Sequence, residues 1–536
     1  MGNFLRIACN LLFIIIFGCS TFAQNNTIPG KVASPYPTLL NLAVEWYIKG
    51  DDNQNGIVTV QFRKKGEDIW RHAMPLRRVP AGSNAGFSWK NKHSGSIFDL
   101  NPNTVYEIKL DLKDPDGGSG EKRLEARTRP VPRIDKNAEI IEIAPGNYDT
   151  LKTRSGTKGR PVVYQCKNGI ATFRYIDLQN RRWVYIEGLH VNNLSKNGIG
   201  IQLNGAKNCV VSRCIVNAVY GIVAYLPGAE NCYISDNVVT GTVEWTPEVM
   251  GPGGENVGEG IEMTGPGNVI CYNKVVGFRD NISTMEDRHV RNQTCIDIYN
   301  NDISIAADDG IEADFCFSNC RIFKNRLTNC FVGLSSQPGL GGPTYFIRNV
   351  MYNITYKAAF KLNRISQGDV ILHNTVIKVG TGLGGSAPID YAYFRNNLAI
   401  GGPTGDVEWG SYGAGNPYAA DIVIPGRHSS FDYDAVGVYK VPYIAKIGGK
   451  PFAEVEKHGI ERIKLGKVFN NVEFPNPPVP EREAPDLRPL PDSRVVDVAV
   501  RIDNVNDDYL GNAPDCGAYE AGQMLPHYGP RLPGKE

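Results

Sequence analysis

The stretch that decides the fold spans residues 301–375 and reads NDISIAADDGIEADFCFSNCRIFKNRLTNCFVGLSSQPGLGGPTYFIRNVMYNITYKAAFKLNRISQGDVILHNT. Within it the pattern apolar-x-x-Asn-x-apolar recurs at Asn325, Asn349 and Asn374, at intervals of 24 and 25 residues. A fixed period of this length in short β-rich segments, without heptads, is the sequence signature of a solenoid whose coils stack on one another. The stretch therefore predicts parallel coils of β-strands.

The repeat extends over residues 138–430. Its marker positions are Gly188, Cys214, Asn237, Asn273, Asn301, Asn325, Asn349, Asn374 and Asn396. One interval is oversized because residues 242–257 are inserted there, and a loop of that size on one coil is typical of a wall of a substrate groove. The marker asparagines are expected to stack inside a turn as a structural ladder, with amides bonded from coil to coil.

A second strand follows in each coil, read as YGIVAY, EGIEMT, DNISTM, DGIEAD, VGLSSQ and AAFKLN. Alternation along each strand points one set of residues inward: Ile222, Ile261, Ile282, Ile311, Leu334 and Phe360. The next residues point outward, one above another: Val223, Glu262, Ser283, Glu312, Ser335 and Lys361. Two positions further on lies a parallel outward column: Tyr225, Thr264, Met285, Asp314, Gln337 and Asn363. Adjacent coils lie ~4.8 Å apart, so these outward side chains are predicted neighbours.

Coils of this length marked by asparagine resemble the right-handed parallel β-helix of the pectin-lyase-like superfamily. The core from ADDGIEAD to ILHNTV, with the ending APDCGAYE, also resembles secreted bacterial right-handed β-helix repeat proteins. The resemblance covers roughly residues 138–525. It implies the fold and an action on polysaccharide. The catalytic motifs of pectate lyases and polygalacturonases are not intact here, so it implies no catalytic residue.

Acidic residues gather on the strand of the central coil and on the turn before it, at Asp308, Asp309, Glu312 and Asp314. Clustered like charges raise at least one pKa, which suits a general acid. The same oxygens are also suited to a hard cation such as Ca²⁺, although the spacing is no EF-hand. A third interpretation is a solvated acidic turn without chemistry.

Hydrolysis of a glycosidic bond is the leading hypothesis, with Glu312 and either Asp309 or Glu262 as acid and base. Inversion is the expected outcome, because it is commoner among hydrolases of the superfamily that the chain resembles. A polysaccharide lyase with Lys361 or Arg364 as base is the alternative. Neighbouring acids raise the pKa of a lysine, which counts against Lys361 as base and favours an ion pair with Glu312 instead. A non-catalytic glycan-binding or adhesion solenoid is the third hypothesis.

Five residues flanking the acids are expected to contact the substrate: Asp308, His289, Gln337, Asn363 and Arg364. The glycine-rich turn 337–343 is a candidate subsite, because glycine lets a flat sugar ring approach the backbone. His373 lies beside a marker asparagine and is expected to be structural. No phosphate loop or nucleophile motif occurs.

Residues 1–23 read as a secretory leader, with Arg6, an apolar run and small residues after it. Cleavage after Ala23 competes with a lipobox-like site that would leave a lipid on Cys19. With either cleavage, we expect a bacterial protein that is exported to the periplasm, the cell surface or the medium. No other membrane span is expected. A net charge of +1 argues against nucleic acid as a partner, and a monomer is expected.

Residues 35–132 form a separate unit of alternating strands, which predicts a small β-sandwich. Its expected core is Trp46, Trp70, Leu100 and Tyr106. The run DLNPNTVY at 99–106 resembles a corner of fibronectin type III domains. Two roles stay open for this unit: carbohydrate binding, or a spacer or cap over the first coil.

The proline-rich segment 431–536 is expected to cap the solenoid. Most of the twelve cysteines fall at repeat positions and are expected to be buried and stacked.

Overall fold

The computed structural model of the chain describes residues 23–284, 293–404 and 413–534. The predicted leader as far as Phe22, Cys19 within it, and also Met285 and His289 lie outside the described residues. The remainder is almost entirely β-structure, and helices are confined to single short turns such as α1 (Phe452–Val455) and α2 (Leu465–Val468). No described helix is long and apolar enough to cross a membrane.

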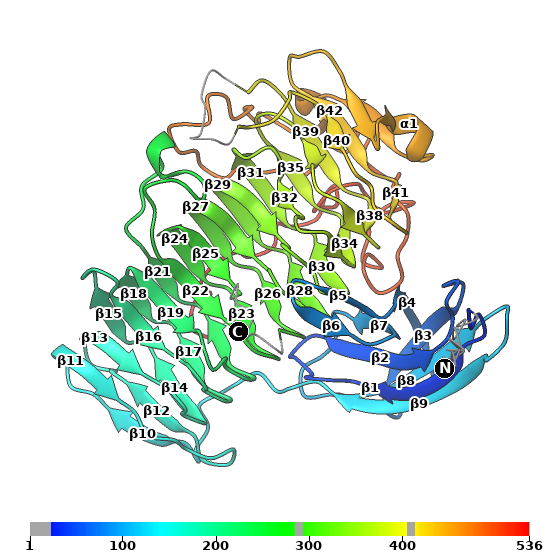
Figure 1. The fold of residues 1–536 in the computed structure, drawn as a ribbon. Coiled ribbons are helices and arrows are strands. Elements are labelled where there is room, and N and C mark those ends of the chain that lie inside the picture. The colour runs from blue at the N-terminus through cyan, green and yellow to red at the C-terminus, as the bar shows by residue number, and fades with distance from the viewer. Residues whose placement is uncertain (1–22, 285–292, 405–412, 535–536) are drawn as a thin grey trace, which may run out of the picture.

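Two long parallel sheets form the predicted β-helix (Figure 1). The first has 12 strands, from β10 (Glu139–Glu142) to β41 (Ser430–Asp432). The second has 18 strands, from β11 (Gly146–Lys152) to β45 (Ile460–Ile463). Regular pairing therefore extends past residue 430, the predicted end of the β-helix. Only the chain after β45 leaves the coils.

The predicted register of the central coils is confirmed. Six strands of the 18-stranded sheet carry it: β19 (Tyr220–Ala224), β22 (Glu259–Met263), β25 (Asp280–Ser283), β27 (Asp302–Glu312), β29 (Arg326–Ser335) and β32 (Phe360–Lys361). Their pairing aligns Val223, Glu262, Ser283, Glu312, Ser335 and Lys361 from coil to coil. The residues before them, from Ile222 to Phe360, lie buried in the core of the solenoid.

The asparagine ladder runs through the interior turn. Each side-chain amide donates to the next side-chain oxygen over 2.8–3.0 Å, along Asn237, Asn273, Asn301, Asn325, Asn349, Asn374, Asn397 and Asp434. The last predicted marker, Asn396, is wrong by one residue. Its amide instead bonds His373 at 2.9 Å and Val500 at 2.8 Å, because the turn places it outside the ladder. His373 is fully buried there, as its structural assignment predicted.

The N-terminal unit is antiparallel, in the order β1 (Ile28–Ala33), β2 (Leu42–Lys49), β7 (Lys92–Ile97), β4 (Arg71–Val79), β3 (Ile57–Lys64), β8 (Val105–Lys113) and β9 (Gly120–Arg127). Trp46, Leu100 and Tyr106 lie in its core as predicted. Trp70 does not. Its ring is half-buried beneath the Arg63 guanidinium, 4.6 Å from the ring centroid.

This unit packs against the middle of the solenoid rather than over its first coil (Figure 1). The Asn41 amide donates to Asp297 at 2.8 Å, and the Ser96 amide donates to the Tyr345 hydroxyl at 3.1 Å. Arg321 is buried between Asp297 and Ser96. Because buried polar groups join the two parts, the unit is neither a loose spacer nor an end cap.

A hairpin of the N-terminal unit, β5 (Gly82–Asn84) and β6 (Phe87–Trp89), covers the glycine-rich turn 337–343. A Cβ on Gly341 would lie 2.6 Å from the Trp89 indole nitrogen, and Leu340 is fully buried. The glycines let a flat ring approach the backbone, as expected, but this ring is the Trp89 side chain of the protein itself. The turn is therefore covered, and the predicted sugar subsite at this turn is wrong.

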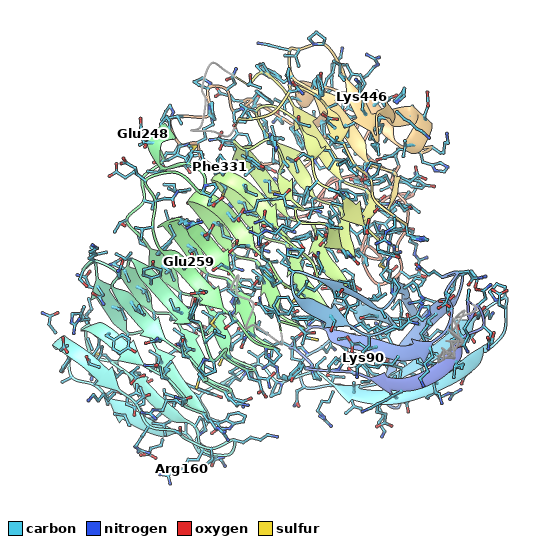
Figure 2. All side chains as sticks on the ribbon, viewed as in Figure 1. Lys90, Arg160, Glu248, Glu259, Phe331 and Lys446 are labelled. Atoms are coloured by element: carbon cyan, nitrogen blue, oxygen red, sulfur yellow. The ribbon has the colours of Figure 1, made fainter. Side chains whose placement is uncertain are left out.

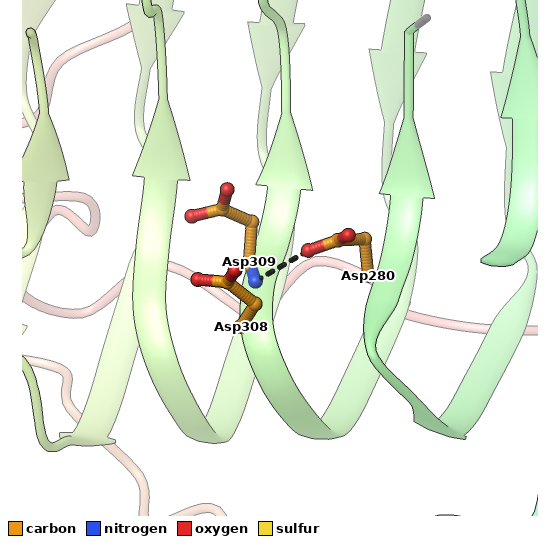
Figure 3. Close-up of side chains that lie close together, drawn as sticks. All are labelled: Asp280, Asp308 and Asp309. Atoms are coloured by element: carbon orange, nitrogen blue, oxygen red, sulfur yellow. Dashed lines mark hydrogen bonds between the residues drawn. The ribbon is translucent and has the colours of Figure 1, made fainter. Parts of the chain in front are cut away.

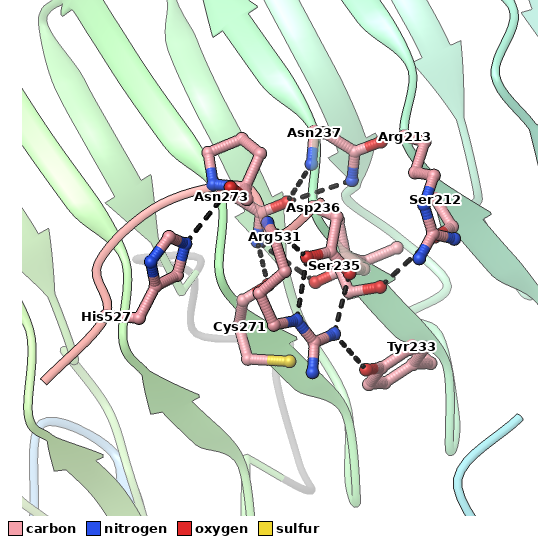
Figure 4. Close-up of polar contacts among 12 residues, drawn as sticks. Ser212, Arg213, Tyr233, Ser235, Asp236, Asn237, Cys271, Asn273, His527 and Arg531 are labelled. Carbon is pink, nitrogen blue, oxygen red and sulfur yellow. Dashed lines mark hydrogen bonds and ion pairs between the residues drawn. The ribbon is translucent and has the colours of Figure 1, made fainter. Parts of the chain in front are cut away.

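The C-terminal tail runs back along the solenoid as far as the coil of Asp236 (Figure 4). Arg531 donates to both carboxylate oxygens of Asp236, at 2.8 and 2.7 Å, and to the Tyr233 hydroxyl at 3.3 Å. Arg348 on the solenoid holds Asp508 of the tail at 3.0 and 2.8 Å. The tail therefore straps the side of the coils over much of their length.

Candidate functional site

The candidate site is a grid of acidic side chains on three consecutive coils of the 18-stranded sheet. Glu259 of β22 is the register partner of Asp280 in β25, and the Asp309 amide of β27 donates to Asp280 at 2.7 Å. Glu262 and Glu312 occupy the neighbouring column of the same coils, with Ser283 between them. Figure 2 places Glu259 on the strands of this sheet. The coil geometry thus gathers carboxyls from three separate parts of the chain.

Asp280, Asp308 and Asp309 form the tightest part of the grid (Figure 3). One carboxylate oxygen from each lies within 4.8 Å of the others. All three residues are buried, and Oδ1 of Asp309 has no hydrogen-bond partner among the described residues. Arg279 approaches Asp280 and Asp308, at 3.6 Å each.

Lys361 reaches into the grid from two coils further along. Its ammonium forms an ion pair with Asp309 and lies 4.0 Å from Asp308. Glu312 is therefore not its direct partner, and the predicted Lys361–Glu312 ion pair is replaced by one with Asp309. Burial lowers the pKa of Lys361, but the charges of Asp309 and the other carboxylates outweigh burial and raise it well above its usual value.

The carboxyls of the grid hold their protons more tightly than exposed ones. Burial raises the pKa of Glu262 to about 7. Burial together with the charge of Asp308 raises the pKa of Asp280 to about 7. Burial, and after it the charge of Asp314, raises the pKa of Glu312 well above its usual value. The grid is therefore a set of acids poised to exchange protons near neutral pH.

In the second predicted column, Asp314, Gln337 and Asn363 lie next to one another, whereas Met285 lies outside the described residues. The Asp314 carboxylate accepts hydrogen bonds from the Ser335 hydroxyl and from the Gln337 amide, both at 2.7 Å. The Asn363 amide donates to the Gln337 side chain at 2.9 Å. Arg364 lies exposed in the turn after this column, where its carbonyl accepts from Asn84 at 2.8 Å. Asp314 is fully buried, and its carboxylate holds the Ser335 hydroxyl and the Gln337 backbone amide in place.

The inserted segment 242–257 lies beside the grid. Trp245 and Met250 pack against Phe331 and Tyr356 of later coils. The Gly251 amide donates to the Ala307 carbonyl at 2.7 Å, immediately before Asp308. The insertion therefore lies along one edge of the acids, and its role as a wall of a substrate groove stays a prediction.

Glu259, Asp280 and Arg279 are site residues that the sequence interpretation missed. The signal was present in the repeat itself: the first letters of EGIEMT, DNISTM and DGIEAD are Glu259, Asp280 and Asp309. Strict alternation assigns the residue two before an inward isoleucine to the interior. A glycine or asparagine between them lets the chain turn, and the register shift in β27 between Ala306 and Asp309 marks that irregularity.

Three oxygens within 4.8 Å fit part of a shell for a hard cation such as Ca²⁺, which takes six to eight oxygen ligands at ~2.3–2.6 Å. The unpartnered oxygen of Asp309 is consistent with such an ion. Arg279 and Lys361 already supply two positive charges to the same carboxylates. The chain by itself can thus balance most of this charge.

No protein-family model matches the chain, and a search of the curated proteins finds no match.

Proposed function

We propose that the protein is a secreted bacterial carbohydrate-active enzyme of the pectin-lyase-like type, acting as a monomer, which hydrolyses a glycosidic bond of a polysaccharide on the outer face of the 18-stranded sheet. The observation that carries the proposal is the placement of Glu262 and Glu312 in one outward column on either side of Ser283. Two carboxyls with raised pKa values facing one side of a strand stack supply both an acid and a base.

The separation of the two glutamates favours inversion. They lie two coils apart, or roughly 10 Å between backbones at ~4.8 Å for each coil. Inverting glycosidases hold their carboxyl groups ~6.5–9.5 Å apart, which leaves space for a water molecule. Ser283 lies in that gap, and its hydroxyl donates to Glu259 at 2.7 Å.

The surroundings of the two glutamates assign the roles. Glu312, whose pKa is raised by burial and by the charge of Asp314, donates its proton to the glycosidic oxygen as the bond to the anomeric carbon breaks. Glu262, with a pKa of about 7, removes a proton from the water that attacks the anomeric carbon from the opposite face. Asp309 and Lys361 bind each other, and in this mechanism they position the grid rather than transfer protons.

A polysaccharide lyase is the second candidate, and the Asp280–Asp308–Asp309 cluster favours it. A Ca²⁺ ion at that cluster would neutralise the carboxylate of a uronate and so acidify its neighbouring C–H bond. The raised pKa of Lys361 counts against this candidate, because a protonated lysine accepts no proton.

The test is a panel of plant and algal polysaccharides, with and without Ca²⁺. Hydrolysis is expected to yield new reducing ends whose anomeric configuration, followed by NMR in the first minutes, is opposite to that of the substrate. Ultraviolet absorbance from unsaturated ends would overturn hydrolysis in favour of the lyase. Binding of a glycan without any cleavage would favour an adhesion solenoid.

A further inference from the structure

A cavity of about 570 Å³ lies at a second place, where three parts of the chain meet. Strand β4 and the residues just before β3 contribute from the N-terminal unit, β38 (Tyr393–Arg395) and β41 from the solenoid, and residues 500–503 from the tail. Both solenoid strands belong to the 12-stranded sheet, whereas the acidic grid lies on the 18-stranded sheet. This junction cavity is therefore separate from the proposed hydrolytic site.

Two guanidinium groups share one aromatic ring in the junction cavity. The Arg77 guanidinium lies 4.4 Å from the centroid of the Tyr393 ring, and the Arg395 guanidinium lies 4.1 Å from it. Arg77 comes from the N-terminal unit and Arg395 from the solenoid, so docking of the two parts brings these like charges together. Both residues line the cavity.

Neither guanidinium forms an ion pair with a carboxylate among the described residues. Arg395 donates to the Phe394 carbonyl at 2.6 Å and to the Ser430 hydroxyl at 2.7 Å. Asp432, its register partner on the next coil, is bonded to His458 at 2.8 Å instead.

The neighbouring arginines differ. Arg78 is paired with Asp51, and Arg501 with Asp503 and Asp507. Burial lowers the pKa of Arg77, and the charge of Arg395 lowers it as well, while Tyr393 and Tyr345 raise it. Asp432 and Asp503 also line the cavity, but they are bonded to His458 and Arg501. Holding two guanidinium groups in a recessed site without a carboxylate partner of their own costs free energy, which a bound anion recovers.

Tyr391, Tyr433 and His428 add flat aromatic rings to the lining. Tyr391 stacks on His428 with ring centroids 5.1 Å apart and planes at 10°, and Tyr433 stacks on His458 at 4.4 Å and 12°. Stacked rings give rigid, half-polar surfaces. The volume is within the ~300–1,000 Å³ of small-molecule sites, which often form between domains, and it exceeds what a bare oxyanion fills.

We propose that the junction cavity binds an anionic sugar residue, with its sulfate or carboxylate held by Arg77 and Arg395 and its ring against the tyrosines. Guanidinium groups suit this role, because their planar fork matches the oxygens of a carboxylate or sulfate. The site would hold a charged polysaccharide on the opposite sheet from the acidic grid, whether or not that grid cleaves it.

Calorimetric titration of the full chain tests the proposal, with a sulfated disaccharide, a uronate-containing disaccharide, a neutral disaccharide and free sulfate as ligands. At least one anionic disaccharide is expected to bind more tightly than both the neutral disaccharide and free sulfate. Arg77→Gln and Arg395→Gln are each expected to weaken that binding about tenfold, because each removes charge-assisted hydrogen bonds to the anion. Arg174→Gln, on an exposed arginine paired with Asp149, is the matched control and is expected to change nothing.

Equal affinity for neutral and anionic sugars, or free sulfate binding as tightly as the sugar, would overturn the proposal. Unchanged binding by Arg395→Gln would do the same. Circular dichroism checks that each variant folds. If Arg77→Gln does not fold, Arg395→Lys decides: it keeps the charge but loses the fork, and weaker binding than in the wild type supports the assignment, while unchanged binding opposes it. An inactive Glu312→Gln protein should still bind at this site, so the two proposals fail separately.

Discussion

Two polar stacks run along the same coils of this solenoid, and their chemistry differs. The asparagine ladder lies inside a turn, and each of its amides both accepts from one neighbour and donates to the next, as Asn325 does with Asn301 and Asn349. In the acidic grid, Glu259, Asp280 and Asp309 follow one another on successive coils, and all three side chains are acids without such complementarity. Stacked amides satisfy one another's hydrogen-bond donors and acceptors, whereas stacked carboxylates repel one another.

The two stacks contribute to the stability of the fold with opposite sign. Stacked amides replace the hydrogen bonds lost to water, so the ladder adds stability at little cost. Stacked buried carboxyls raise their own pKa values, so the grid remains partly protonated and destabilises the fold when it ionises. Proton transfer is the function that we propose for this stack.

The largest expected effect concerns the grid. Glu312→Gln keeps the shape of the side chain but removes the acidic proton, and turnover of the cleaved polysaccharide is expected to fall ~10²–10⁴-fold. Initial rates of reducing-end release measure it. Glu255→Gln, an exposed carboxyl in the neighbouring insertion, should leave the rate unchanged. Full activity in Glu312→Gln would sink the assignment of the acid.

The ladder is expected to respond in stability. Asn325→Leu removes the acceptor of the Asn301 amide and the donors to the Ile298 carbonyl and Asn349. Several buried polar groups lose their partners at ~1–3 kcal/mol each, so the free energy of unfolding should fall by about 3 kcal/mol or more. Guanidinium unfolding measures it, with the exposed Asn147→Leu as control. Equal stability of the two variants would mean that the ladder is dispensable.

The pH dependence sharpens the comparison. Glu262 has a pKa of about 7 in the fold against a usual 4.5, so the folded state binds more protons than the unfolded state between those values. Stability contributed by this group therefore falls as pH rises from about 4.5 to about 7. Glu262→Gln should be about 3 kcal/mol more stable than the wild type at pH 8 and nearly equal to it at pH 4.

Chemical unfolding across that pH range measures the difference, and Glu255→Gln should show no such trend. A Glu262→Gln protein that is less stable than the wild type at pH 8 would contradict the burial of an ionisable group at this position.

The smallest effect is expected for a reductant. All ten cysteines of the described residues are free, and all but Cys166 are buried. A disulfide typically contributes about 2–4 kcal/mol, so an unchanged thermal midpoint with dithiothreitol is expected. A drop would reveal a disulfide that joins these coils.

Much of the fold was predictable because it is written as local repetition. Period-two alternation aligned Glu262, Glu312 and Lys361 over five coils. The same rule missed Glu259 and Asp280, because it takes no account of the turn that a glycine or asparagine introduces. It also chose Asn396 over Asn397, since two adjacent asparagines give the same pattern and only the turn distinguishes them.

The sequence by itself determined the solenoid, its ladder and the outward acids, because coil stacking turns a fixed period into contact between neighbours. Only the tertiary structure decided that Lys361 pairs with Asp309, that Trp89 occupies the glycine-rich turn, and that Arg77 meets Arg395 across two domains. These contacts join segments with no common period, so their partners depend on how whole surfaces dock and not on any local rule.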